Sequence, residues 1–226
     1  MSAYPVTYEV DYIEKRSRLS VLFRLLLLIP HAIVAYVVVI ALLFSAIARW
    51  FAVVVTGRYP EGLYTFNANA ARWLARYSAY AYLQVDKYPP FGFEDYPEYP
   101  LRMRSAGPLP QYSRLKALFR LILGIPVAII AYVVSIVLSV CTVAAWFVAV
   151  IVGKMPRGLH EALDFCLAYF AKAYAYFLLL TETYPPFSNE NPTLEPAGTP
   201  GELAARPGGS APSVSTPSPR PGGLEG

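Results

Sequence analysis

The sequence has little charge, and two long stretches have almost none. Charged side chains make up 15% of the 226 residues and hydrophobic ones 56%, whereas a soluble domain usually carries about 25% charged residues. From Pro30 to Thr56 the only acidic or basic side chains are His31 and Arg49, and Pro126 to Val152 contains none. Each run is long enough to cross a hydrocarbon core of about 30 Å, so the sequence predicts an integral membrane protein.

Several classes of function leave no signature in the sequence. The two cysteines, Cys141 and Cys166, both lie in apolar helical stretches, and we interpret them as small buried residues rather than as a disulfide. There is no nucleophile elbow, phosphate-binding loop, haem or zinc spacing, or pair of catalytic carboxylates. No basic groove lined with aromatic residues points to nucleic acid. We therefore expect no enzymatic activity, no cofactor, no metal site and no nucleic-acid partner.

The chain contains the same unit twice. Ser17–Phe91 aligns with Ser113–Phe187 without a gap, and almost half of the aligned residues are identical. The identities include Arg, Pro, Gly and Trp, which chance similarity between apolar segments would not reproduce, so the chain is an internal duplication. The predicted organisation is repeat one in residues 1–91, a linker with a second arm in 92–112, repeat two in 113–187, and a disordered Pro/Gly-rich tail in 188–226.

Each repeat is predicted to be an interfacial amphipathic helix followed by a helical hairpin. In repeat one, Ser17 caps an entry helix that reaches Ile29, and Pro30 then kinks or restarts the helix. A second, less apolar helix returns antiparallel to the first. We interpret it as a span, with a partly interfacial position as the alternative. The residues predicted to shape the turns are Pro30, Gly57, Pro60 and Gly62, with Pro126, Gly153, Pro156 and Gly158 in repeat two.

The resulting fold prediction is an all-α integral membrane protein with four spans, short extended arms and a disordered C-terminal tail. An even number of spans per repeat makes the repeats parallel, related by an axis near the membrane normal. Basic residues are more frequent in the entry segments and linker than in the turns, which places both termini in the cytoplasm. Alternating side chains in Tyr4–Tyr12 and Tyr99–Arg104 predict extended arms that can pair beside the membrane.

Four arginines are the candidate binding residues. Arg18 and Arg24 of repeat one recur as Arg114 and Arg120 of repeat two, each in an apolar context. An arginine there either extends to the headgroup region to escape the bilayer core, or binds an anionic headgroup or an acidic partner group. Arg49 has no basic counterpart, and we expect its side chain to extend toward the turn side.

The remaining polar residues of the helices suggest structural roles. Asp86 and Glu182 match at the helix exits, where each is expected to pair with a basic residue of an entry helix. His31 corresponds to a valine in repeat two, so a polar tip at the interface explains it better than a metal or proton-relay role. Because repeat one offers no ligands at the positions of His160 and Asp164, we interpret that pair as part of a solvated helix start.

The motifs of repeat one resemble those of the domain of unknown function 4389 family. They are Ser17–Leu19, Ile29–His31, Trp50–Ala52, Thr56–Pro60 and Tyr88–Phe91. Repeat two departs from them at Val127, Val148 and Val152–Pro156. The resemblance covers residues 4–187 in two copies. It implies a bacterial membrane protein and brings no activity and no catalytic residues.

The function predicted from the sequence is therefore that of a non-enzymatic protein of the bacterial cytoplasmic membrane, multi-pass, with contacts to anionic lipid headgroups. The first hypothesis is an accessory or scaffold subunit of a membrane complex, with a membrane protein or a second copy of the chain as partner. The alternative is a lipid or small-solute carrier with a site between the two repeats.

Overall fold

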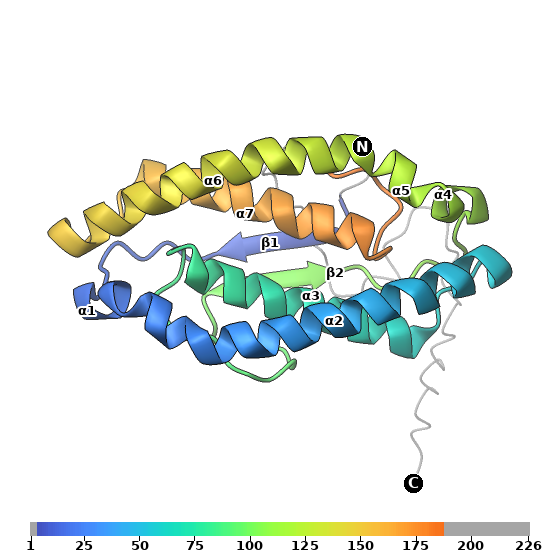
Figure 1. The fold of residues 1–226 in the computed structure, drawn as a ribbon, viewed down its shortest axis with the longest axis horizontal. Helices are drawn as coiled ribbons and strands as arrows, with labels where there is room; N and C mark the ends of the chain where they lie inside the picture. The colour runs from blue at the N-terminus through green and yellow to red at the C-terminus, as the bar shows by residue number, and fades with distance from the viewer. Residues whose placement is uncertain (1–3, 188–226) are drawn as a thin grey trace, which may run out of the picture. The chain divides into compact units, whose positions relative to one another are not determined.

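The computed structural model describes residues 4–187, so the predicted disorder of residues 188–226 lies outside the described part. The same order of elements occurs twice: a strand, a short entry segment, a long apolar helix and a shorter returning helix (Figure 1). Repeat one contains β1 (Val6–Val10), α1 (Arg18–Leu22), α2 (Arg24–Thr56) and α3 (Glu61–Ala81). The linker and repeat two contain β2 (Leu101–Ser105), α4 (Arg114–Leu118), α5 (Arg120–Leu123), α6 (Ile125–Val152) and α7 (Arg157–Phe177).

The entry helices begin as predicted but end earlier. The Ser17 hydroxyl accepts a hydrogen bond from the Ser20 amide, and Ser113 caps α4 in the same way. The helix then breaks at Phe23 rather than at Pro30, and α2 runs through the proline. Buried Leu28 and His31 hold α2 on both sides of Pro30, which compensates for the hydrogen bond that proline removes. In repeat two the predicted restart is confirmed, because Pro126 lies in the first turn of α6.

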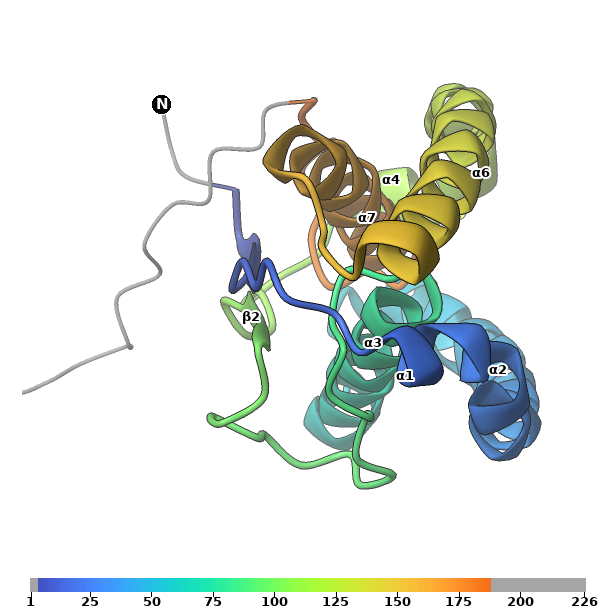
Figure 2. The ribbon, with the colours of Figure 1, turned by 90° about the vertical axis from the view of Figure 1, so that its left-hand side faces the viewer.

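The elements form three layers. Figure 2 shows α2 and α6 on one side, α3 and α7 in the middle, and the strands on the other side. The returning helices pack against each other and against the long helix of their own repeat. The core therefore lies around α3 and α7, with buried alanines at many of the contacts between helices, as the small-residue spacing of these helices favours.

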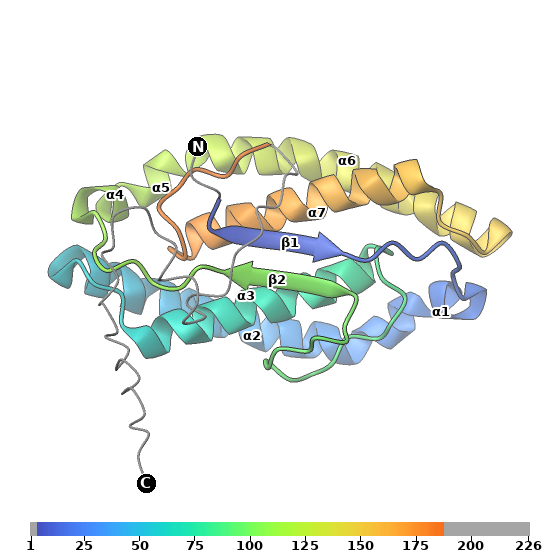
Figure 3. The same ribbon diagram turned by 180° about the vertical axis from the view of Figure 1, so that it is seen from behind.

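The two arms pair into a ribbon, as the sequence suggested. Strands β1 and β2 are antiparallel, with Val6 opposite Ser105 and Val10 opposite Leu101 (Figure 3). Tyr4 and Tyr12, which flank β1, donate hydrogen bonds to the carbonyls of Lys172 at 3.2 Å and Met155 at 2.7 Å. The ribbon therefore runs along the length of α7 and joins the two repeats.

The two repeats run in opposite directions. The Arg16 amide donates to the carbonyl of Gly153 at 3.0 Å, and the Tyr112 amide donates to the carbonyl of Gly57 at 2.9 Å. Each entry segment thus meets the closing turn of the other repeat, which makes α2 and α6 antiparallel (Figure 1). The prediction of parallel repeats is wrong, because β2 carries the linker back along the molecule before repeat two begins.

Among residues 4–187, two helical segments have the length and apolarity of membrane spans, and the four spans expected from the sequence are not shown. The two segments are Arg24–Thr56 and Arg120–Val152, each of 33 residues. The returning helices α3 and α7, which carry more polar side chains, do not reach that apolarity within the described residues. Large apolar side chains are exposed along both long helices, including Ile33, Leu43, Phe51, Ile136 and Phe147. These surfaces support a membrane location.

The glycines that end the long helices have backbone conformations that other residues rarely adopt. Gly57 and Gly153 have φ angles of 71° and 74° and cap α2 and α6, as predicted. A Cβ on Gly57 would lie 3.3 Å from Nε of Arg114, and one on Gly153 would lie 3.0 Å from Nε of Arg18. The turns are therefore also the points where the other repeat makes contact.

We expect Gly57→Ala to lower the free energy of unfolding by about 1–2 kcal/mol, the cost of the left-handed backbone for a residue with a Cβ. Gly62→Ala is the matched control: it lies within α3, and an added Cβ would meet no heavy atom within 4 Å. This control should be neutral or slightly stabilising. Chemical unfolding in detergent micelles measures both, and equal losses would contradict the assignment of the turn.

Candidate functional site

Two of the four predicted binding arginines are buried and hold the ends of the returning helices. Arg24 forms an ion pair with Asp86, and its guanidinium donates to the carbonyls of Tyr80 at 2.8 Å and Val85 at 3.1 Å. It also lies over the Tyr80 ring, 4.4 Å from the ring centroid. Because this guanidinium does not reach the surface, we assign it a structural role in place of the headgroup contact expected from the sequence.

Arg120 occupies the equivalent place in repeat two. Its Nε donates to the carbonyl of Tyr176 at 3.1 Å, its Nη2 donates to that of Thr181, and its guanidinium lies over the Tyr176 ring. Glu182 accepts from the Ser113 amide at 2.7 Å and pairs with Lys116 at 3.9 Å. The expected pairing of Asp86 and Glu182 with basic entry-helix residues is therefore confirmed, in each case within the same repeat.

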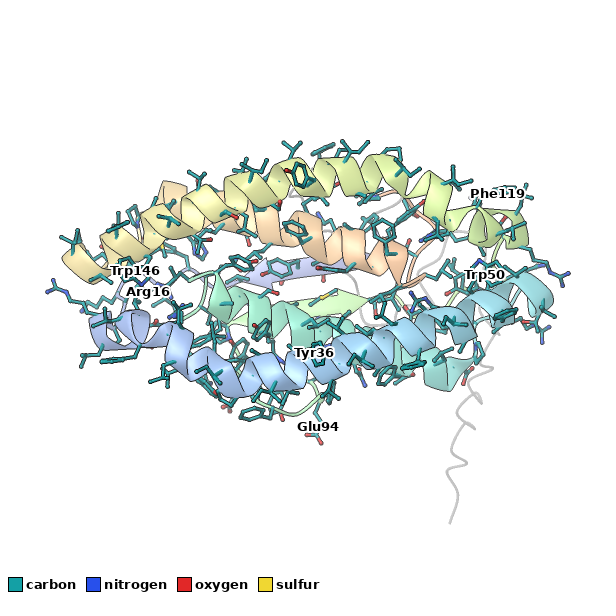
Figure 4. All side chains as sticks on the ribbon, in the orientation of Figure 1. Arg16, Tyr36, Trp50, Glu94, Phe119 and Trp146 are labelled. Carbon is teal, nitrogen blue, oxygen red and sulfur yellow. The ribbon has the colours of Figure 1, made fainter. Side chains whose placement is uncertain are left out.

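Arg18 and Arg114 are exposed and lie at opposite ends of the repeat pair. Arg18 is next to Gly153 and donates to the carbonyl of Val152 at 3.3 Å, and Arg114 is next to Gly57. At the Gly153 end, the buried guanidinium of Arg16 donates to the carbonyl of Gln84 at 2.8 Å, within repeat one (Figure 4). Burial lowers the pKa of the Arg16 guanidinium, an effect that the nearby Asp86 carboxylate opposes. Arg18 and Arg114 therefore remain the candidates for contact with headgroups.

A candidate binding space lies between the repeats. It is a cavity of about 490 Å³ lined mainly by α2, α3 and α7, with Leu138 of α6 and with Tyr8 and Met103 of the ribbon. This volume is within the range of small-molecule sites, about 300–1,000 Å³. Leu43 and Tyr174, whose exposed fractions are 63% and 55%, also line the cavity, so it opens at the surface. Most of the lining is apolar, as a hydrocarbon chain requires.

Arg49 brings a positive charge to this cavity. Its exposed fraction is 7%, and its Nη1 donates to the Ser45 hydroxyl and the Asn67 side-chain oxygen, both at 3.2 Å. Its Nη2 donates to the carbonyl of Phe177 at 3.3 Å. All these partners are neutral, and no carboxylate among residues 4–187 forms an ion pair with Arg49. The side chain points inward instead of extending toward the turn, which corrects the sequence-based expectation.

The polar side chains of the Arg49 cluster occur in repeat one alone. The positions of Ser45, Arg49 and Asn67 are occupied in repeat two by Cys141, Ala145 and Leu163. The Ser45 hydroxyl donates to Asn67 at 2.6 Å, and the Asn67 amide donates to the carbonyl of Leu63 at 2.7 Å. The departure of all three positions from the repeat pattern was the signal that could have identified this site from the sequence.

Both histidines pack against aromatic rings. His31 is buried among Trp73, Tyr77, Tyr88 and Phe91, and its Nδ1 lies 2.9 Å from the Tyr88 hydroxyl. It therefore packs in an aromatic cluster rather than forming the expected polar tip at the interface. His160 packs against the Tyr12 ring. Across residues 4–187 there is no group of three His, Cys, Asp or Glu side chains arranged to hold a metal ion.

Comparison with protein families identifies both repeats. A family model described as a domain of unknown function, DUF4389, matches residues 18–92 and 114–189. Because these segments together cover more than half of the chain, the chain belongs to the DUF4389 family, and it carries two tandem copies of the domain. No curated protein and no solved structure matches the chain.

We expect Arg24→Met to lower the free energy of unfolding by about 3–5 kcal/mol, because it removes the cation that pairs with Asp86 and two hydrogen bonds to the carbonyls of Tyr80 and Val85. Arg18→Met removes the same charge from an exposed position in α1 and should cost less than about 1 kcal/mol. Thermal and chemical unfolding in micelles compare the two variants. Similar losses in both would show that the buried pair is not what holds the end of α3.

Proposed function

We propose that this member of the DUF4389 family is a non-enzymatic membrane protein that binds an anionic amphiphile in the cavity between its two repeats. The observation that carries the proposal is the buried Arg49 guanidinium, which lines an apolar cavity and has no acidic partner among residues 4–187. This is the carrier hypothesis, made more specific by the chemistry of the cavity.

The charge on Arg49 favours an anion. Serine, asparagine and carbonyl oxygens satisfy its hydrogen bonds, but they do not neutralise the charge, and an uncompensated buried charge is costly. A ligand carboxylate would supply the missing counter-charge and can accept two parallel hydrogen bonds from a guanidinium. The apolar walls formed by Leu42, Leu74 and Phe170 suit the chain of the same ligand. We therefore propose a long-chain carboxylate, such as a fatty acid, as the ligand class.

The proposed location is the bacterial cytoplasmic membrane. Support comes from the exposed apolar faces of α2 and α6, which only lipid or another apolar partner would keep from water. Arg18 and Arg114, exposed at the two ends, would contact anionic headgroups. We keep the expectation that both termini are cytoplasmic.

The accessory or scaffold subunit is the second candidate. The same exposed helix faces favour it, because they offer a long apolar surface to a helix of a membrane partner or to a second copy of this chain. Native mass spectrometry of the protein released from its own membranes separates the two hypotheses. A bound amphiphile supports the proposed function, whereas a stoichiometric protein partner with an empty cavity supports the subunit.

We expect Arg49→Met to weaken binding of a long-chain fatty acid such as oleate roughly tenfold or more, since a hydrogen bond to a charged group contributes about 1.5–3 kcal/mol. The binding of an alcohol of equal chain length should change little. Displacement of a fluorescent fatty acid from the protein in nanodiscs measures both ligands.

The matched control for this experiment is Arg58→Met, which removes an exposed arginine near the end of the same helix and outside the cavity. It should leave the affinity for the acid unchanged. Equal affinity of the unmodified protein for the acid and the alcohol would contradict the role of Arg49, and the absence of binding by either would contradict the proposed function.

A further inference from the structure

We infer that the protein lies along the membrane surface, with α2 and α6 embedded side by side in one leaflet, instead of crossing the bilayer. The partner of this surface is the acyl layer of a single lipid leaflet. The inference rests on where the exposed charges lie along the helices and does not depend on the ligand of the cavity.

The side of the molecule formed by α2 and α6 exposes no charge along its length. Every basic side chain of α2, namely Arg24, His31 and Arg49, is buried, and α6 has none. The exposed residues are uncharged and include many large apolar side chains and two tyrosines: Tyr36 at the middle of α2 (Figure 4) and Tyr132 of α6, each 70% exposed. The exposed cations Arg18 and Arg114 lie only at the two ends.

Exposed charges lie at mid-length near the returning helices. Arg72, at the middle of α3, is 4.0 Å from Asp95, whose side chain is 69% exposed. Arg72 is next to Trp73, which packs with Ala35 and Val38 of α2, so the Asp95 carboxylate is level with the central part of that helix. Figure 4 shows Glu94 pointing away from the protein near the middle of α2.

The ribbon adds further charge at the same level. Arg102 of β2 pairs with Asp11 at 2.6 Å and with Glu9 at 3.9 Å, and all three side chains are exposed. Since the ribbon follows α7 from Lys172 to Met155, these charges lie between the ends of the helices. The ribbon is a sheet of only two strands among the described residues, so each strand has an edge without a partner strand.

A spanning orientation would place these groups in the hydrocarbon core. A charged side chain at the centre of a bilayer costs about 2.5–3.5 kcal/mol by insertion measurements, and open strand edges exposed to lipid do not occur at that depth. In the surface orientation the apolar side is in lipid, and the ribbon and Asp95 are in water.

Three single cysteines test this orientation in the full chain. In a Cys141→Ser, Cys166→Ala background, the exposed residues Arg58, Lys154 and Glu94 are each replaced by cysteine. Vesicles of both orientations, right-side-out and inside-out, are then treated with a membrane-impermeant maleimide. We expect all three positions to react in vesicles of one orientation and none in the other.

Every other labelling pattern overturns the inference. Antiparallel repeats that span the bilayer would place Arg58 and Lys154, at the two turns, in opposite compartments. Four parallel spans would place Glu94 opposite both turns. Because all three substitutions are at exposed positions, each variant should keep the unfolding midpoint of the background, which is measured before labelling.

A depth measurement provides the second test. Nitroxide labels on Tyr36→Cys and Tyr132→Cys, at matching positions of the two repeats, report depth through their accessibility to oxygen and to a nickel chelate. A surface orientation predicts both labels about 5–10 Å below the headgroups. Labels at the bilayer centre, about 15 Å deep for a core of about 30 Å, would overturn it, as would labels shielded from both reagents by a second copy of the chain.

Discussion

Each repeat is held at both ends by the other. The backbone of Arg16 bonds to the turn at Gly153, the backbone of Tyr112 bonds to the turn at Gly57, and the strands pair between them. These contacts join residues that are distant in the sequence, and they fix the opposite directions of the two long helices. The layered packing, the cavity and the separation of apolar from charged surface all depend on these contacts between the entry segment of one repeat and the turn of the other.

The two repeats have similar backbones, and residues that differ at matching positions form the candidate site. Arg24 and Arg120 close their own repeats in nearly the same way, through carbonyl acceptors and a tyrosine ring. The Arg49 cluster has no such counterpart, and repeat two is apolar at the matching positions. One repeat therefore contributes the polar end of the cavity, and Leu138, Phe170 and other residues of the second contribute apolar wall.

Features encoded within one repeat were predictable from the sequence, and features that depend on both repeats were not. Ser17 and Gly57 act on their own backbone, and Asp86 pairs within its repeat, so their signals were local. The direction of one repeat relative to the other depends on the linker strand, and hydropathy is the same for either direction. An arginine in an apolar helix can reach either headgroups or buried carbonyls. The position of the Arg24 side chain could therefore be found only once Tyr80 was located in the fold, and that of Arg49 only once Asn67 was located.

The pairing of β1 with β2 also governs the order in which the protein can be completed during synthesis. When repeat one leaves the ribosome, its first strand has no partner until residues 101–105 follow, and the backbone amide of Arg16 lacks its acceptor until Gly153 is made. The apolar helix α2 must meanwhile be kept from water by lipid or by a chaperone. The first repeat therefore cannot complete its fold until the linker strand and the second repeat have been synthesised.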